Sequence, residues 1–85
     1  MKNSIRVRVT QKDIDKGEPI CDNRCPIALA ISRTVKRRVG VTYGAVYLLN
    51  EVHQMYELTP AAERFIRRFD NGQPVKPFTF TMRPV

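Results

Sequence analysis

The side chains best suited to nucleophilic or metal chemistry in this sequence are two cysteines and one histidine. Cys21 and Cys25 form a C-x₃-C pair, and His53 is the only histidine. A structural zinc site requires four ligands, and this set supplies at most three of them. A catalytic thiol requires a nearby base, and no spacing in the sequence brings His53 to Cys25. We therefore predict no metal, no cofactor and no catalytic residue at these positions.

Cys25 stands directly before Pro26, where we predict a helix to begin. A thiol at a helix N-terminus can have a lowered pKa and raised reactivity, so an enzyme that relies on Cys25 is a third, less favoured interpretation. We favour a small core or capping residue at this position. The spacing allows a disulfide between Cys21 and Cys25, but the reducing cytoplasm that we expect for this protein does not favour one.

The carboxylates form no recognisable acid–base pair. Asp13 and Asp15 lie in a predicted loop, and Glu51 and Asp70 lie at predicted turns. The sequence has no glycine-rich phosphate loop and no pattern typical of a serine hydrolase. We therefore predict a protein that acts by binding and has no enzymatic activity.

The charge balance is the strongest signal in the composition. Fifteen Lys and Arg stand against eight Asp and Glu, which gives a net charge of +7, and ten of the fifteen are Arg. The planar guanidinium suits phosphate and carboxylate, so this bias favours recognition of an anion. No apolar run approaches the roughly 18 residues of a membrane span. We expect a cytoplasmic protein with no membrane partner.

Hydrophobic periodicity predicts the first half of the fold. Apolar and polar side chains alternate over residues 5–10, which predicts a strand with one buried face. Residues 11–24 lack a clear period and are predicted to be an ordered loop, with one helical turn at residues 13–15 as the alternative. Pro26 fits the first position of a helix, which we expect to continue through Lys36–Arg38 and to end at Gly40.

The second half repeats this pattern. Residues 41–49 and 52–58 are predicted strands of a hairpin with its turn at residues 50–51, and Gly44 is expected to mark a bulge. Thr59 and Pro60 predict the start of a helix that ends near Asp70. Residues 78–83 alternate again and predict a last strand, and the prolines around it suggest an edge position.

The predicted order is β-α-β-β-α-β, a single α+β domain over residues 1–85. Two βαβ units with right-handed crossovers predict a ferredoxin-like split arrangement, with two helices on one face of a four-stranded sheet and the last strand beside the first. A three- or four-stranded sheet with another strand order is the alternative. A chain of 85 residues buries a modest share of its surface, and a homodimer is one way to gain stability.

The predicted fold places cations on two surfaces. The open face of the sheet collects Arg6, Arg8, Arg83 and three threonines at positions 10, 79 and 81. One register of the hairpin adds tyrosines at positions 43 and 47, His53 and Met55 to this face, and buries Val46, Leu48, Val52, Tyr56 and Leu58. The opposite register of its first strand buries the tyrosines instead. Interleaved arginines and aromatic rings are typical of single-stranded nucleic-acid binding, whereas a solvated sheet or a dimer interface is the structural alternative.

The second basic surface lies on the two predicted helices. Its members are Arg33, Lys36, Arg37, Arg38, Arg64, Arg67 and Arg68, with only Glu63 to balance them. If the helices pack side by side, their outer faces form one broad positive patch. Because this charge exceeds what helix dipoles require, we expect the patch to contact phosphate or an acidic partner.

Several segments resemble short hypothetical proteins encoded by bacteriophages and prophages. The resemblance lies in the opening strand, in residues 13–17, in Cys25-Pro26-Ile27-Ala28-Leu29-Ala30, and in the stretch from Phe65 to Phe80. It implies a phage-type gene expressed in the cytoplasm of a bacterial host, and it implies no activity and no functional residue.

Two hypotheses about function follow. The first is a non-enzymatic module that binds nucleic acid through the arginine-rich surfaces. The alternative is a protein-interaction module that binds an acidic surface of a bacterial host protein and acts as an inhibitor or adaptor.

Overall fold

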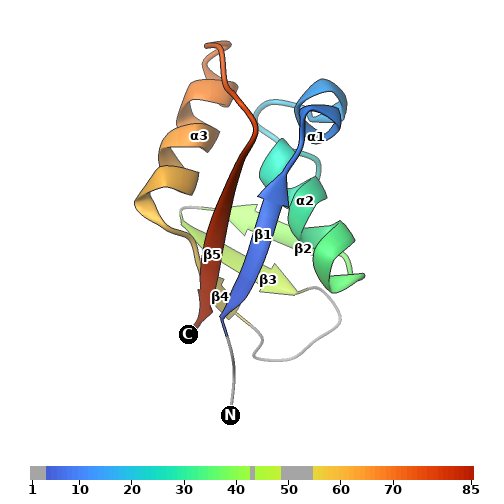
Figure 1. The fold of residues 1–85 in the computed structure, drawn as a ribbon, viewed down its shortest axis with the longest axis vertical. Coiled ribbons are helices and arrows are strands. Elements are labelled where there is room, and N and C mark those ends of the chain that lie inside the picture. The colour runs from blue at the N-terminus through green and yellow to red at the C-terminus, as the bar shows by residue number, and fades with distance from the viewer. Residues whose placement is uncertain (1–3, 43, 49–54) are drawn as a thin grey trace.

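The computed structural model describes residues 4–42, 44–48 and 55–85, which form an α+β fold of five strands and three helices (Figure 1). In chain order the elements are β1 (Ile5–Val9), α1 (Gln11–Lys16), α2 (Pro26–Val35), β2 (Val39–Thr42), β3 (Ala45–Leu48), β4 (Met55–Glu57), α3 (Pro60–Asp70) and β5 (Phe78–Pro84).

All strand pairs of the sheet are antiparallel, in the order β1-β5-β4-β3-β2. The last strand lies beside the first, as predicted. The ferredoxin-like split arrangement is not confirmed, because it has four strands and two helices, whereas this fold has five strands and three helices. The sheet curls, so that β1 and β5 run at a large angle to β2, β3 and β4 (Figure 1).

The fifth strand arises because the segment predicted as one strand over residues 41–49 is two. β2 ends at Thr42, and β3 begins at Ala45 and pairs back with it. Gly44 has a φ of +80°, a conformation that glycine adopts without steric cost. Its position marks a turn between two strands and not the predicted bulge. The predicted turn at residues 50–51 lies outside the described residues.

Residues 11–16 form the helix α1, where a loop was predicted. Thr10 is its N-cap: its hydroxyl accepts a hydrogen bond from the Asp13 amide at 3.2 Å, and the Asp13 carboxylate accepts one from the Thr10 amide at 2.9 Å. This reciprocal pair is a capping box, formed here by Asp where Glu or Gln is more usual. A helix of six residues is too short to show an apolar period in the sequence, so hydrophobic periodicity does not predict it.

The helix α2 begins as predicted but ends earlier. Cys25 is the N-cap and Pro26 the first helical residue, yet the helix ends at Val35 and not near Gly40. Lys36 adopts the left-handed conformation at φ 58°, and its amide donates to the Ser32 carbonyl at 2.7 Å. Val39 is then free to start β2 with its side chain in the core. Residues 36–38 therefore form a turn and not the last turn of a helix.

The helix α3 and the strand β5 occupy their predicted segments. Thr59 accepts from the Ala62 amide at 3.3 Å and Pro60 opens α3, as expected. β5 lies between β1 and β4, so its predicted edge position is wrong. The sheet tolerates Pro84 because the hydrogen bond to β4 at this end comes from the Val85 amide, which donates to the Met55 carbonyl at 3.0 Å, so no N–H of residue 84 is required.

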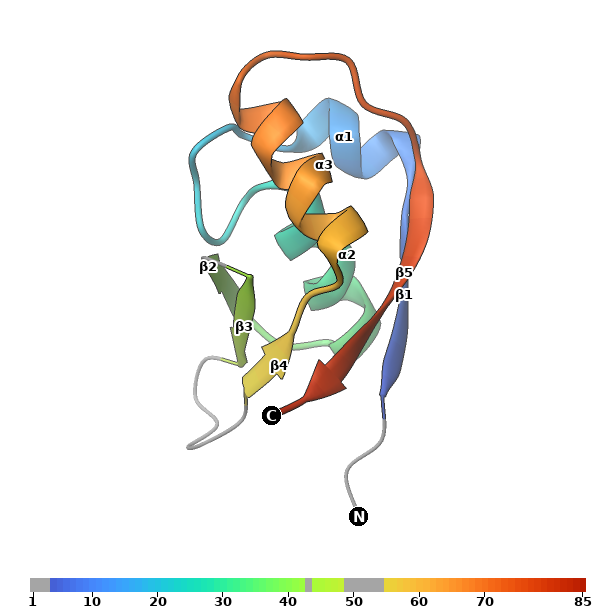
Figure 2. The same ribbon diagram turned by 90° about the vertical axis from the view of Figure 1, so that its left-hand side faces the viewer.

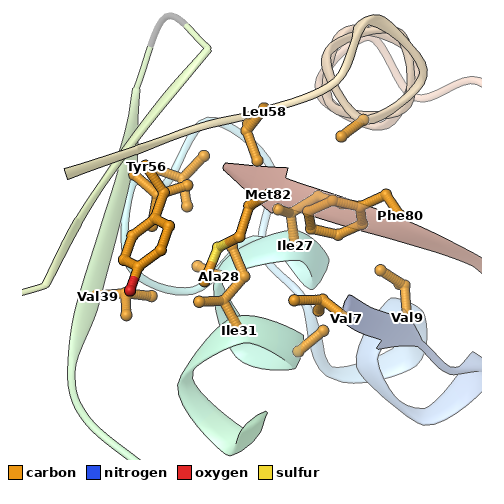
Figure 3. Packing of buried hydrophobic residues seen from close by; sticks show 14 of the residues in the cluster. Val7, Val9, Ile27, Ala28, Ile31, Val39, Tyr56, Leu58, Phe80 and Met82 are labelled. Atoms are coloured by element: carbon orange, nitrogen blue, oxygen red, sulfur yellow. The ribbon is translucent and has the colours of Figure 1, made fainter. Parts of the chain in front are cut away.

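One hydrophobic core fills the concave side of the curled sheet (Figure 3). The inward residues of β1 and β5, including Val7, Phe80 and Met82, face Ile27 and Ile31 of α2. Figure 2 shows α3 on one side of the fold, between the β1–β5 pair and the β2–β3 hairpin. Each large apolar side chain buried in this way contributes about 1.5–3 kcal/mol, so the alternation along β1 and β5 determines which face is left for solvent.

Candidate nucleic-acid interface

The outer face of β1 and β5 carries the most regular array of cations in the described structure. Arg6 and Arg8 of β1 and Arg83 of β5 are exposed, as are the threonines at positions 79 and 81. In the strand register Arg8 lies opposite Thr79 and Arg6 opposite Thr81, and Arg83 follows two residues beyond Thr81. Each successive outward level therefore holds one arginine, at intervals of about 6.8 Å along the strands.

This row of arginines, which we call the arginine strip, has little acidic compensation. Among the described residues, none of Arg6, Arg8 and Arg83 forms a salt bridge. The outward positions of β1 and β5 hold no carboxylate, and Glu57 of β4, opposite Arg83 in the register, is the adjacent acidic residue at one end. The strip is therefore a positive surface bordered by hydroxyl groups.

Within the described ranges, no tyrosine joins the arginines of this strip. The buried set of the hairpin is confirmed at Val46, Leu48, Tyr56 and Leu58, and Tyr47 is exposed as the first register requires. However, Tyr47 belongs to β3, which β4 separates from β5. Met55 is half-buried, and Tyr43, Val52 and His53 lie outside the described residues.

The predicted helix patch is divided. α2 and α3 run in opposite directions, so the segment that follows α2 lies at the lower end of the fold in Figure 1, whereas α3 ends at the top. Lys36, Arg37 and Arg38 belong to the first of these ends, and Arg67 and Arg68 to the second. The helices therefore present two separate basic groups instead of one broad surface.

Arg33 is committed to an internal ion pair that sequence reasoning missed. Its guanidinium donates to both carboxylate oxygens of Asp13, with Nη2 at 3.0 Å from Oδ2, and to the main-chain carbonyl of Arg8 at 2.9 Å. Burial raises the pKa of the Asp13 carboxyl, but hydrogen bonds from Arg33 and Thr10 outweigh burial and hold that pKa below its ordinary value. With its charge neutralised, Arg33 is a weak candidate for phosphate contact.

Two hollows flank α3 and separate its arginines. Arg67 borders a cleft of about 440 Å³ between α3 and β2, where Asp22, Glu63 and Asp70 are also found. Arg64 and Arg68 border a groove of about 510 Å³ on the other side, together with Lys76. The first hollow is rich in carboxylates, whereas the lining of the second contains none.

Cys25 is a buried capping residue, as predicted. Its sulfur accepts a hydrogen bond from the Ala28 amide at 3.3 Å. Burial raises the pKa of the Cys25 thiol above its ordinary value, which opposes the lowered pKa that a helix N-terminus alone can produce. Cys21 and Cys25 are both free thiols, and Cys21 donates to the Asn23 side chain at 3.2 Å.

Within the described ranges, no group of three or more potential ligands from His, Cys, Asp and Glu could hold a metal ion. In the same part of the chain no helix has the length and apolar character needed to cross a bilayer. The chain matches no model of a protein family, no functionally characterised protein and no solved structure at a significant level.

Proposed function

We propose that this protein is a nucleic-acid-binding module and that the outer face of β1 and β5 is its principal contact surface. The observation that carries the proposal is the row of Arg6, Arg8 and Arg83, one arginine at each outward level of a rigid two-stranded ribbon. The resemblance to phage and prophage proteins adds the proposed setting, the cytoplasm of a bacterial host.

The chemistry of the strip supports phosphate recognition. Each arginine can donate two parallel hydrogen bonds to a phosphate, and its charge releases counterions from the nucleic acid. Thr79 and Thr81 add hydroxyl donors directly across from Arg8 and Arg6. Because the side chains project from paired strands whose other face is buried in the core, the ribbon holds them in place without a folding cost at the moment of binding.

The test measures binding of labelled DNA and RNA by fluorescence anisotropy over a series of salt concentrations. We expect affinity to fall steeply with salt. Replacing Arg6 and Arg8 with Gln (R6Q/R8Q) should weaken binding and lower the salt slope by about 0.7 to 0.9 for each phosphate that the protein no longer neutralises. The variant should unfold at the same denaturant concentration as the original, because both side chains are exposed.

The matched control is R24Q/R67Q, which removes the same charge from another part of the surface. Arg24 lies in the loop that precedes α2, and this loop is on the side of the fold opposite β1 and β5 (Figure 2). We expect this variant to retain most of the affinity. If R6Q/R8Q and R24Q/R67Q lost nucleic-acid affinity to the same extent, net charge and not the strip would drive binding. Absence of binding even at low salt would overturn the proposal in favour of an acidic protein partner.

A further inference from the structure

The groove between α3 and the segment leading into β5 combines an apolar floor with a basic rim. Pro74, Val75, Phe65, Phe78 and Ala61 contribute its apolar surface. Arg64, Arg68 and Lys76 are exposed around it, and none of them forms a salt bridge among the described residues. A hollow of about 510 Å³ is large enough for a small planar group.

The floor is rigid because its rings belong to the core. Phe78 stacks on Phe65 of α3 with ring centroids 5.0 Å apart, and on Phe80 with centroids 5.7 Å apart. Phe65 in turn stacks on Phe69. Val75 and Phe78 remain half-buried, so part of each is open to an occupant. A preformed apolar floor costs little ordering entropy when it is covered.

The groove lies beside one end of the arginine strip, around the edge of β5. Phe78, the first residue of β5, stacks on Phe65 of α3, whereas Thr79 points to the outer face and lies opposite Arg8. Lys76 lies two residues before the strand. Figures 1 and 2 show the segment before β5 descending beside α3 into the strand that carries the strip. The groove therefore adjoins the end of the strip that Arg8 occupies, and β4 does not pair with β5 at this end, so the edge of β5 leaves a path from the outer face into the groove.

We propose that this groove holds an unpaired base of a single-stranded nucleic acid whose backbone follows the arginine strip. This inference rests on the proposed function and narrows it to single strands. The base would cover Val75 and Phe78, and the planes of Arg64 and Arg68 would stack on it or bind its phosphate.

The groove, and not the spacing of the strip, favours a single strand over a duplex. The cations of the strip recur about every 6.8 Å, which is twice the advance of about 3.4 Å per phosphate along a duplex strand, so either ligand fits that spacing. In a duplex, however, every base is paired inside the stack and none is free to enter the groove. A single strand can extend to match the ribbon and can release a base into the groove, as in other proteins that combine a basic track with an apolar platform.

The experiment compares three labelled probes of equal length with the full chain: single-stranded DNA, its duplex, and a single strand in which every base is absent. All carry the phosphate backbone, and only the first offers unpaired bases. We expect the single strand to bind at least about fivefold more tightly than the abasic strand, which corresponds to the lower limit of about 1 kcal/mol that stacking of one base contributes. At equal phosphate concentration the duplex, whose bases are all paired, should bind less tightly than the single strand.

A groove-filling variant locates the effect. Ala61 is exposed on α3 and lines the groove, so A61W should fill it without changing any charge. We expect A61W to reduce the affinity ratio between normal and abasic strands to near one while abasic binding stays unchanged. The control T34W places the same ring on an exposed position of α2, where the ratio should be retained.

The outcomes separate this inference from the proposed function. Equal affinity for normal and abasic strands, or a ratio that A61W leaves intact, overturns the base-binding groove while strip-dependent binding stands. Absence of binding to all three probes overturns both. A labelled copolymer of glutamate and leucine that binds the original but not A61W, in the absence of nucleic-acid binding, would assign the groove to an acidic peptide instead.

Discussion

The guanidinium of Arg33 lies against the carboxylate of Asp13 and joins three elements of the fold at one point. Asp13 caps α1, Arg33 projects from α2, and the same guanidinium reaches the carbonyl of Arg8 near the end of β1. The Asp13 side chain is 5% exposed and that of Arg33 50%, so the carboxylate is buried and the cation partly solvated. The pair holds α1 against the end of the strip that adjoins the proposed groove.

Removing the carboxylate should destabilise the whole domain. Asp13→Ala removes half of the capping box, worth about 1 kcal/mol, and charge-assisted hydrogen bonds worth about 1.5–3 kcal/mol, part of which solvent restores to the exposed Arg33. We expect the free energy of unfolding to fall by about 2–3 kcal/mol, measured by urea denaturation. Asp15→Ala is the control: Asp15 is exposed and accepts a hydrogen bond from the Gln11 side chain, so its replacement should change stability by no more than about 0.5 kcal/mol.

The same carboxylate should make stability depend on acid pH. Because its pKa in the folded protein lies below the ordinary value of 3.8, the folded state binds fewer protons than the unfolded state near that pH. The stabilising contribution of Asp13 is therefore complete above its unfolded pKa and disappears as pH falls through the folded pKa. Between neutral pH and about pH 3, the urea midpoint should fall less in D13N than in the original. An identical acid shift in both proteins would contradict this assignment.

The two thiols should react at very different rates. Cys21 is partly exposed, whereas Cys25 is buried and the pKa of its thiol is raised by that burial. With a disulfide reagent at about pH 8, we expect one thiol to be labelled quickly and the other at least about tenfold more slowly. The variant C21S should retain only the slow phase and C25S only the fast one. If both thiols of the folded protein reacted in fast labelling phases, Cys25 would not be a buried capping residue.

Two glycines of the β2–β3 hairpin should respond oppositely to alanine. Gly44 has a positive φ, and an added Cβ would lie 2.6 Å from the Glu63 carboxylate, so Gly44→Ala should cost about 1–2 kcal/mol. Gly40 lies in β2 with nothing within 4 Å of an added Cβ. Gly40→Ala should therefore be neutral or stabilise by about 0.4–1 kcal/mol, because it restricts the unfolded chain. Thermal unfolding of both variants tests the contrast.

Local sequence patterns correctly predict the elements whose structure depends mainly on their own residues. The alternation around Val7 and Phe80 correctly predicts two half-buried strands, and Thr59 with Pro60 correctly predicts the start of α3. The same alternation predicts that Arg6, Arg8 and Arg83 face outward. These features depend on the alternation of apolar and polar side chains and on capping residues within a few positions of the helix start. Both can be read directly from the sequence.

The features that local patterns missed depend on contacts between distant segments. The ion pair between Asp13 and Arg33 joins residues 20 positions apart. The early end of α2 at Lys36 follows from the need to bring Val39 into the core, which no helix signal reveals. Neither feature could be derived from periodicity, because both are settled by packing.

The sequence by itself determined an α+β domain, its strongly basic charge, and which side chains of β1 and β5 face the solvent. Only the tertiary structure decided how the cations are grouped. The order of the antiparallel strands separates Tyr47 from the arginine strip, and the opposite directions of α2 and α3 divide the helix cations. The physical reason is that charge and period belong to the chain, whereas the neighbours of an exposed side chain depend on how buried surfaces pack together.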